Sequence, residues 1–147
     1  MNLTKSQEQY IAAVYQLAEE EKGARICDIA QKLSITSASA SLSMKKLGQK
    51  GLVCKTVERH VCLTKEGNRQ AVQILNRCKI IKKFLIEVLG VEQQAAQADA
   101  GTMGHAISPD TMRAIRRFVE KTELEAGLAE NSPVLFGAGE SSRTPPR

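Results

Sequence analysis

The stretch from Arg25 to Leu63 constrains the fold of this chain more than any other part of it. Apolar residues recur at spacings of three and four in 26–33 and again in 37–49, which predicts two amphipathic helices separated by a tight break. Two strand-like runs follow, at 52–56 and 60–63, on either side of a short turn. This order predicts a helix-turn-helix followed by a β-wing, a unit whose second helix can enter the major groove of DNA.

The second of these helices carries polar side chains on its outer face. Thr36 is the predicted N-cap, because its hydroxyl can accept a hydrogen bond from a free amide of the first turn. Hydroxyl and ammonium groups bind phosphates and base edges, and a helix N-terminus can also hold a phosphate. A solvated, serine-rich helix in an ordinary helical domain is the alternative. The predicted DNA-binding residues are Thr36, Ser37, Ser39, Ser41, Lys45 and Lys46 on the helix and Arg59 on the wing.

The rest of the chain is predicted to be helical, so the predicted fold class is mainly α with a small β-wing. Further helices are expected at 4–21, 65–89, 92–100, 101–107 and from Pro109 to about Gly127. Three parts follow from this pattern. They are a winged-helix DNA-binding domain at 1–68, a helical dimerisation domain at 69–126 and a disordered tail at 127–147 that is rich in Gly, Ser and Pro.

Positive charge is concentrated in the half of the chain that contains the helix-turn-helix. The first 90 residues hold 15 lysines and arginines against 8 acidic residues, whereas the last 57 hold 6 against 8. This distribution indicates a polyanionic partner such as double-stranded DNA. Apolar faces on the later helices exceed what a monomer needs, which favours a homodimer that places two recognition helices on a near-palindromic operator.

Cysteine spacing and the absence of an apolar run of about 18 residues predict a cytoplasmic protein with reduced thiols and no membrane span. Three cysteines, Cys27, Cys54 and Cys62, are expected to be small core residues. Cys78 and His105 could form a thiol–imidazole pair, but no third group that would orient them can be identified, so no enzyme is predicted.

Six segments together closely resemble the iron- and manganese-dependent repressors, the diphtheria toxin repressor family. They span about residues 3–120 and read LTKSQEQYIAAVYQLAEE, ARICDIAQKLSITSASAS, LGQKGLV, LTKEG, FLIEVLGV and HAIS. The resemblance implies a winged-helix domain, a helical dimerisation and metal-binding domain, and a homodimer that binds operator DNA when Fe or Mn is bound. It also implies the short form of the family, without an SH3-like domain.

The metal ligands that the resemblance implies are largely replaced. An Arg-His pair of the family is Arg77-Cys78 here, and a motif that ends in Glu-His keeps only its histidine, His105. The Met or Asp that precedes the family's tyrosine is Gln9. The resemblance therefore leaves Cys78, His105 and Gln9 as candidate ligands for a divalent transition metal, Mn, Fe or Zn. Thiolate and imidazole suit Zn better than Mn or Fe(II), which prefer several oxygen or imidazole ligands.

Several interpretations of this altered site stay open. It could be a remnant that no longer binds metal, a rebuilt site for a softer metal, or a site at which the thiol of Cys78 senses redox state. The predicted function is a DNA-binding transcriptional regulator, and the family resemblance implies that it is a repressor. A dimerising interaction module, or a metal-independent or redox-responsive regulator, is the alternative.

Overall fold

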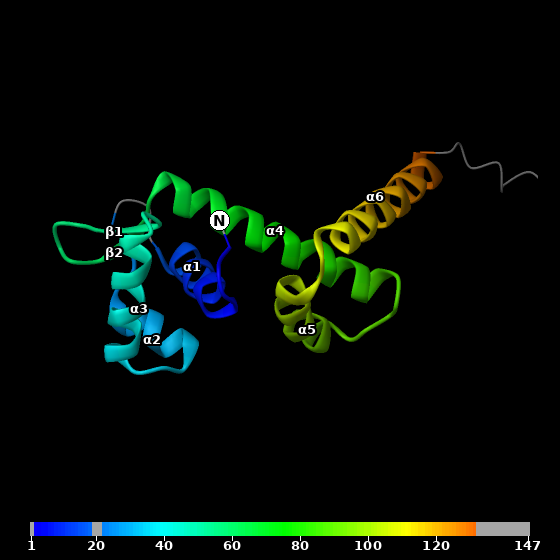
Figure 1. Cartoon of the computed structure of the whole chain (residues 1–147). Coiled ribbons are helices and arrows are strands. Elements are labelled where there is room, and N and C mark those ends of the chain that lie inside the picture. Colours follow the sequence, from blue (N-terminus) through cyan, green and yellow to red (C-terminus); the bar gives the residue numbers. More distant parts are fainter. Residues whose placement is uncertain (1, 19–21, 132–147) are drawn as a thin grey trace, which may run out of the picture.

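The computed structural model describes residues 2–18 and 22–131, and Figure 1 shows their arrangement. The predicted fold class, mainly α with a small β-wing, is confirmed. In chain order the described elements are α1 (Lys5–Leu17), α2 (Ile26–Leu33), α3 (Ser37–Gln49), β1 (Val53–Lys55), β2 (Val61–Leu63), α4 (Lys65–Glu87), α5 (Gln93–Ala106) and α6 (Pro109–Asn131).

Capping interactions and backbone conformation set several of the ends of the first three helices. A capping box opens α1, since the Thr4 hydroxyl accepts from the Gln7 amide and the Gln7 side chain accepts from the Thr4 amide. Ser34 adopts the left-handed conformation, with φ of 55°, and ends α2. The predicted cap Thr36 then accepts from the Ser39 amide at the start of α3. The two helices of the helix-turn-helix therefore have the bounds that the sequence predicts.

The wing is a two-stranded antiparallel sheet with one buried face. Val53 pairs with Leu63, and Lys55 pairs with Val61. Val53 and Val61 are almost fully buried in the first hydrophobic cluster, together with apolar residues of α1, α2, α3 and α4. On the other side of β2, Ala24 pairs with Val61 in an isolated antiparallel β-bridge. One face of the wing is thus fixed against the helices, and the other is turned away from them.

Helix α4 joins the two halves of the molecule (Figure 1). Its N-terminal part contributes Ala71 and Ile74 to the first hydrophobic cluster. Ile81 and Leu85, about two turns further on, belong to a second cluster with residues of α5 and α6. Because one continuous helix takes part in both cores, residues between Ile74 and Ile81 lie at the junction of the two halves.

The C-terminal helices differ from the prediction in two ways. Residues 93–106 form one helix, α5, rather than two. Gly104, which lowers helix propensity, is buried, and a Cβ placed on it would lie 3.4–3.6 Å from Arg77, Cys78 and Ile81, so packing against α4 outweighs local propensity. Helix α6 begins at Pro109 as predicted but continues to Asn131, past Gly127, and the remainder of the predicted tail, 132–147, lies outside the described residues.

The expectation that three cysteines belong to the core is wrong. Cys27 and Cys54 are exposed, and Cys62 is only half-buried. Cys54 and Cys62 alternate with the buried valines along β1 and β2, so they lie on the face of the wing that the helices leave uncovered. In the described part of the chain, no helix combines the length and the apolar character that crossing a membrane requires.

Candidate DNA interface and the region of the expected metal site

Helix α3 presents its predicted DNA-binding residues to solvent. Thr36, Ser37, Ser39, Ser41, Lys45 and Lys46 are all exposed. The buried face of the same helix, Ala40, Met44 and Leu47, holds it against the first hydrophobic cluster. The Thr36 hydroxyl accepts from the Ser39 amide at 3.1 Å and donates to the Ser39 hydroxyl at 2.9 Å, so these two side chains are partly used in forming the cap. Ser37, Ser41 and the two lysines are oriented outward without such a contact.

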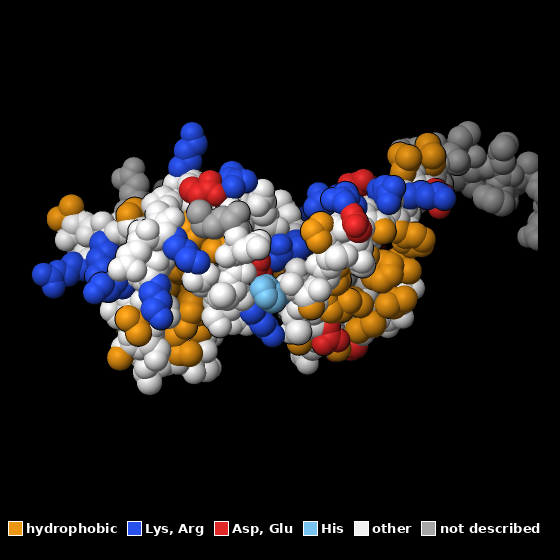
Figure 2. Space-filling model, in the orientation of Figure 1, with side chains coloured by type: hydrophobic (Ala, Val, Ile, Leu, Met, Phe, Trp, Pro, Cys, Tyr) orange, Lys and Arg blue, Asp and Glu red, His pale blue; other side chains and the backbone are white. Residues whose placement is uncertain are grey.

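The wing brings further positive charge to the same end of the molecule. Arg59 is exposed and adopts a positive φ of 61° in the turn between β1 and β2, where its amide donates to the Thr56 carbonyl at 2.9 Å. Figure 2 shows lysine and arginine side chains gathered over this end of the molecule. Leu42 is an apolar exception on α3, with 55% of its surface exposed. The described surface therefore combines a projecting helix, a projecting turn and positive charge, as a DNA interface requires.

At the junction of the two halves, one carboxylate from α1 meets an arginine from α4 and a histidine from α5. Glu8 Oε2 accepts from an Arg77 terminal nitrogen at 2.8 Å. The same oxygen lies 3.3 Å from His105 Nδ1. The side chains of Glu8 and Arg77 are 17% and 26% exposed, so the pair is largely shielded from water. Glu8 was not among the predicted site residues, and its partners are 69 and 97 positions away in the sequence.

The candidate metal ligands lie on different sides of this carboxylate. Cys78 and Gln9 line a hollow of about 230 Å³ between α1, α4 and α5. His105 instead lines a neighbouring hollow with Arg77 and Glu8. Within residues 2–18 and 22–131, no three side chains of His, Cys, Asp or Glu gather in a way that could hold a metal ion.

The chemistry of these side chains also fits a divalent cation poorly. Burial raises the pKa of the Cys78 thiol above its ordinary value of 9.0, and the charge of Glu8 adds to this while that of Arg77 opposes it. A metal-binding cysteine has to be deprotonated, so the shift acts against binding. The carboxylate nearest to His105 is already paired with a guanidinium, and Arg77 Nε is buried without an acceptor. A second cation placed here would meet positive charge rather than free ligands.

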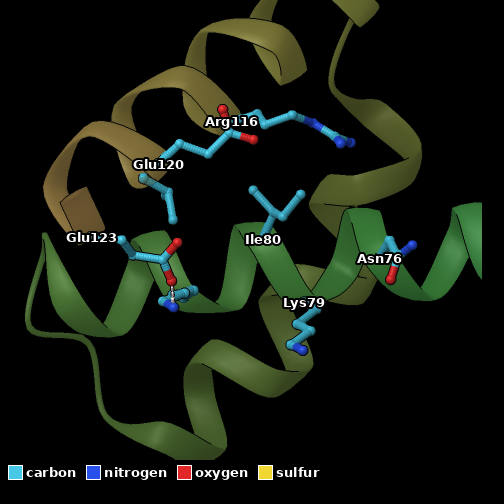
Figure 3. Close-up of a pocket in the computed structure, with 8 residues that line it drawn as sticks. Asn76, Lys79, Ile80, Arg116, Glu120 and Glu123 are labelled. Atoms are coloured by element: carbon cyan, nitrogen blue, oxygen red, sulfur yellow. Dashed lines mark ion pairs between the residues drawn. The ribbon is translucent and has the colours of Figure 1, made fainter. Parts of the chain in front are cut away.

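A further hollow, of about 290 Å³, lies between α4 and α6 (Figure 3). Ile80 points into the space between the two helices, with Arg116, Glu120 and Glu123 on the α6 side. Lys83 of α4 forms an ion pair with Glu123 across it. Charges of both signs line this hollow, so it has no marked preference for an anion or a cation.

Apolar surface is exposed in the half that contains α5 and α6 (Figure 2). Phe84 and Phe118 form an edge-to-face ring pair with centroids 6.2 Å apart, yet Phe118 remains 50% exposed. Leu89 and Leu124 are 59% and 66% exposed. Exposed large apolar side chains in one region are typical of a protein interface.

Two domain profiles cover almost all of the described chain. The iron dependent repressor N-terminal DNA binding domain matches residues 2–61, and the iron dependent repressor metal binding and dimerisation domain matches residues 64–125. This chain belongs to the iron-dependent repressor family. Members of this family are DNA-binding transcriptional repressors that dimerise, and the family is one of transcription regulators rather than enzymes. The predicted family membership and the prediction that the chain is no enzyme are confirmed.

Relatives in bacteria and archaea support the same membership. The transcriptional regulator MntR of Escherichia coli is 34% identical over 112 residues, which cover 76% of this chain and 72% of MntR. An HTH-type transcriptional regulator of Methanocaldococcus jannaschii is 29% identical over 120 residues, which cover 81% of this chain and 96% of that regulator. A solved manganese-dependent transcriptional repressor in complex with manganese is 25% identical with a TM-score of 0.69, covering 78% of this chain and 52% of that one. This iron-dependent repressor family member thus spans about half the length of that structure.

Proposed function

We propose that this protein is a sequence-specific transcriptional repressor. It would bind a near-palindromic double-stranded DNA site as a homodimer. Helix α3 and the wing turn would contact DNA, with Lys45, Lys46 and Arg59 on phosphates and the serines on phosphates or base edges. Family membership and the exposed basic surface support this proposal. The apolar surface of the α5 and α6 half supports the homodimer.

We further propose that its ancestral metal site is degraded and that the protein holds its DNA-binding form without a divalent metal. The observation that carries this proposal is the contact of Glu8 with both Arg77 and His105. A guanidinium is always charged in proteins, so Arg77 is a cation built into the chain. It attracts the carboxylate of α1 toward α4 and α5, which is where a bound metal ion would otherwise join the same elements.

Glu8, Arg77 and His105 together are called the ion-pair cluster here, and their position gives this cluster a structural role. Glu8 lies on α1, which packs in the first hydrophobic cluster, whereas His105 lies on α5, which packs in the second. Arg77 lies on α4 between Ile74 and Ile81, at the junction of the two clusters. The cluster therefore fixes the half that carries α3 relative to the half that would form the dimer. In a dimer, this relation sets the spacing of the two recognition helices.

Substitution of Arg77 tests the proposal. Arg77→Met keeps the apolar stem of the side chain but removes its charge, so the largely shielded Glu8 carboxylate loses its guanidinium partner and keeps only its contact with His105. We expect the free energy of unfolding to fall by about 1–3 kcal/mol, between the values typical of surface and buried pairs. Affinity for DNA fragments selected from genomic DNA by the wild-type protein should fall as well. Arg113→Met is the matched control, since the Arg113–Asp110 pair on α6 is exposed and its loss should change neither quantity measurably.

The outcomes separate the two parts of the proposal. If the wild-type protein selects no DNA fragments under any condition, the DNA-binding function is wrong and a dimerising interaction module becomes the better interpretation. If the wild type binds DNA but Arg77→Met binds equally well without metal, the ion-pair cluster has no role in holding the DNA-binding form.

A further inference from the structure

The uncovered face of the wing holds two cysteines directly opposite each other. Cys54 on β1 and Cys62 on β2 are partners in the antiparallel register. Residues opposite each other in such a sheet project from the same face, so the two thiols are neighbours. Their electrostatic interaction contributes to a raised pKa of Cys62, after the larger effect of its burial. Neither cysteine belongs to the expected metal site, and neither is needed for the proposed contacts with DNA.

The backbone hydrogen bonds define the kind of pair that the two cysteines form. The Thr64 amide donates to the Leu52 carbonyl at 3.0 Å, and the Thr56 amide donates to the His60 carbonyl at 2.8 Å. Hydrogen-bonded pairs recur at every second position of an antiparallel ladder, so the cysteine pair, midway between these two, is also of the hydrogen-bonded type. Cα atoms in such a pair are about 5.5 Å apart, within the range of about 4.4–6.8 Å that a disulfide spans.

The two thiols differ in how exposed they are to solvent, so they would react in a fixed order. Cys54 is exposed, so a reagent in solution can reach it first. Cys62 is half-buried, and its Sγ lies beside Gly23, 2.8 Å from where a Cβ on that glycine would be. A rotation about the Cα–Cβ bond would bring the Cys62 thiol from Gly23 toward Cys54, and such side-chain rotations are fast.

We propose that Cys54 and Cys62 form a dithiol modification site that small disulfide compounds oxidise to a disulfide bond across the wing. The Cys54 thiolate attacks one sulfur of the compound, forms a mixed disulfide and releases one thiol. The Cys62 thiolate then attacks the Cys54 sulfur, forms the protein disulfide and displaces the second thiol. The protein loses two electrons and two protons, and the small disulfide is reduced to two thiols.

The geometry makes this bond reversible under mild conditions. Cβ atoms opposite each other in a sheet are about 4.5–5.5 Å apart, whereas those of a relaxed disulfide are about 3.8 Å apart. Closing the bond therefore draws the two strands together on this face, and strained bonds of this kind are more easily reduced than relaxed structural ones. The turn between the strands carries Arg59, so the modification site lies on the same element as a proposed DNA contact.

Oxidised glutathione, applied to the full-length protein, tests the proposal. In the wild type, Cys54 and Cys62 should together lose two hydrogens without gaining glutathione, whereas exposed Cys27 can carry a glutathione adduct. Proteolysis should yield one linked peptide pair that contains Cys54 and Cys62. Cys62→Ser should stop at a glutathione adduct on Cys54, and Cys54→Ser should form no internal disulfide. A Cys27→Ser, Cys78→Ser double variant should form the same Cys54–Cys62 linked pair as the wild type, and circular dichroism would verify that each variant is folded.

Two results would overturn the proposal. One is a wild-type protein that stays fully reduced, or that accumulates only glutathione adducts, under conditions in which exposed thiols react. The other is a loss of two hydrogens that persists in Cys54→Ser or disappears in the Cys27→Ser, Cys78→Ser variant, since either would assign the bond to a different pair.

Discussion

At the scale of single residues, Gly67 shows how closely the wing approaches α4. A Cβ on Gly67 would overlap the Leu52 carbonyl oxygen, which belongs to rigid backbone. We predict that Gly67→Ala lowers the free energy of unfolding by about 1–3 kcal/mol or more, measured by urea titration. Gly127→Ala is the matched control, because no atom lies within 4 Å of its added Cβ. That change should raise stability by about 0.5–1 kcal/mol, and equal losses at both positions would contradict the close approach.

Lys46 provides a residue-scale test of the DNA interface. It is exposed on α3, and its charge would neutralise one phosphate. We predict that Lys46→Ala weakens binding to all DNA sequences and reduces the slope of log affinity against log salt concentration by about one unit. Lys121→Ala, on α6 in the other half of the molecule, should leave the slope unchanged. A slope that is the same for Lys46→Ala and wild type would remove Lys46 from the interface.

Residue chemistry also sets the limit of what the sequence could predict. Thr36 as a cap follows from its hydroxyl and the residues after it, and the structure contains that cap. The cluster of Glu8, Arg77 and His105 could not be predicted, since its members are brought together only by packing of α1, α4 and α5. The same holds for the exposure of Cys54 and Cys62, which depends on which face of the wing the helices cover.

At the scale of elements, the start of α4 combines a cap with an ion pair. The Thr64 hydroxyl accepts from the Gly67 amide at 3.0 Å. Hydrogen bonds from Arg69, and then from Gln70, lower the pKa of Glu66 from its ordinary value of 4.5 to about 2. A depressed carboxyl pKa contributes stability that is present above pH 4.5 and is lost as the pH falls from 4.5 toward 2.

The resulting prediction concerns acid unfolding. Glu66→Gln should be less stable than the wild type at neutral pH, and its free energy of unfolding should fall less steeply between pH 4.5 and pH 2. Arg69→Met, which removes the largest cause of the shift, should act in the same direction. Urea titrations across this pH range would measure both slopes. Parallel curves for wild type and Glu66→Gln would show that this carboxylate makes no pH-dependent contribution.

Element bounds were predictable where local signals agreed with packing. Helices α2 and α3 have their predicted bounds, since both the apolar spacing and the caps indicate them. Separate helices are predicted at 92–100 and 101–107, but the structure has one helix, and Gly104 is a point of close packing on α4. Helix α6 also continues beyond Gly127. Glycine in a sequence signals either a break or a close approach, and only the tertiary structure distinguishes them.

At the scale of the whole molecule, the apolar surface of the α5 and α6 half predicts an assembly. Leu124 is 66% exposed on α6, within the segment that matches the dimerisation domain. We predict that Leu124→Lys shifts the protein toward monomer in sedimentation experiments, since a charge in an apolar interface is costly. Leu42→Lys, which changes a leucine of similar exposure on α3, should leave the assembly unchanged. An unaltered dimer in Leu124→Lys would place the interface elsewhere.

We propose that the ion-pair cluster of Glu8, Arg77 and His105 takes the place of a bound metal ion in joining the two halves of the molecule. The most direct test is the affinity of the purified wild-type protein for a selected DNA site, first in excess chelator and then with Mn, Fe(II) or Zn added singly. We predict the same affinity in chelator and with each of the three metals. Binding that is absent in chelator and restored by any one of these metals would contradict the proposal. The metal that restores binding would then indicate which kind of ligand its site contains.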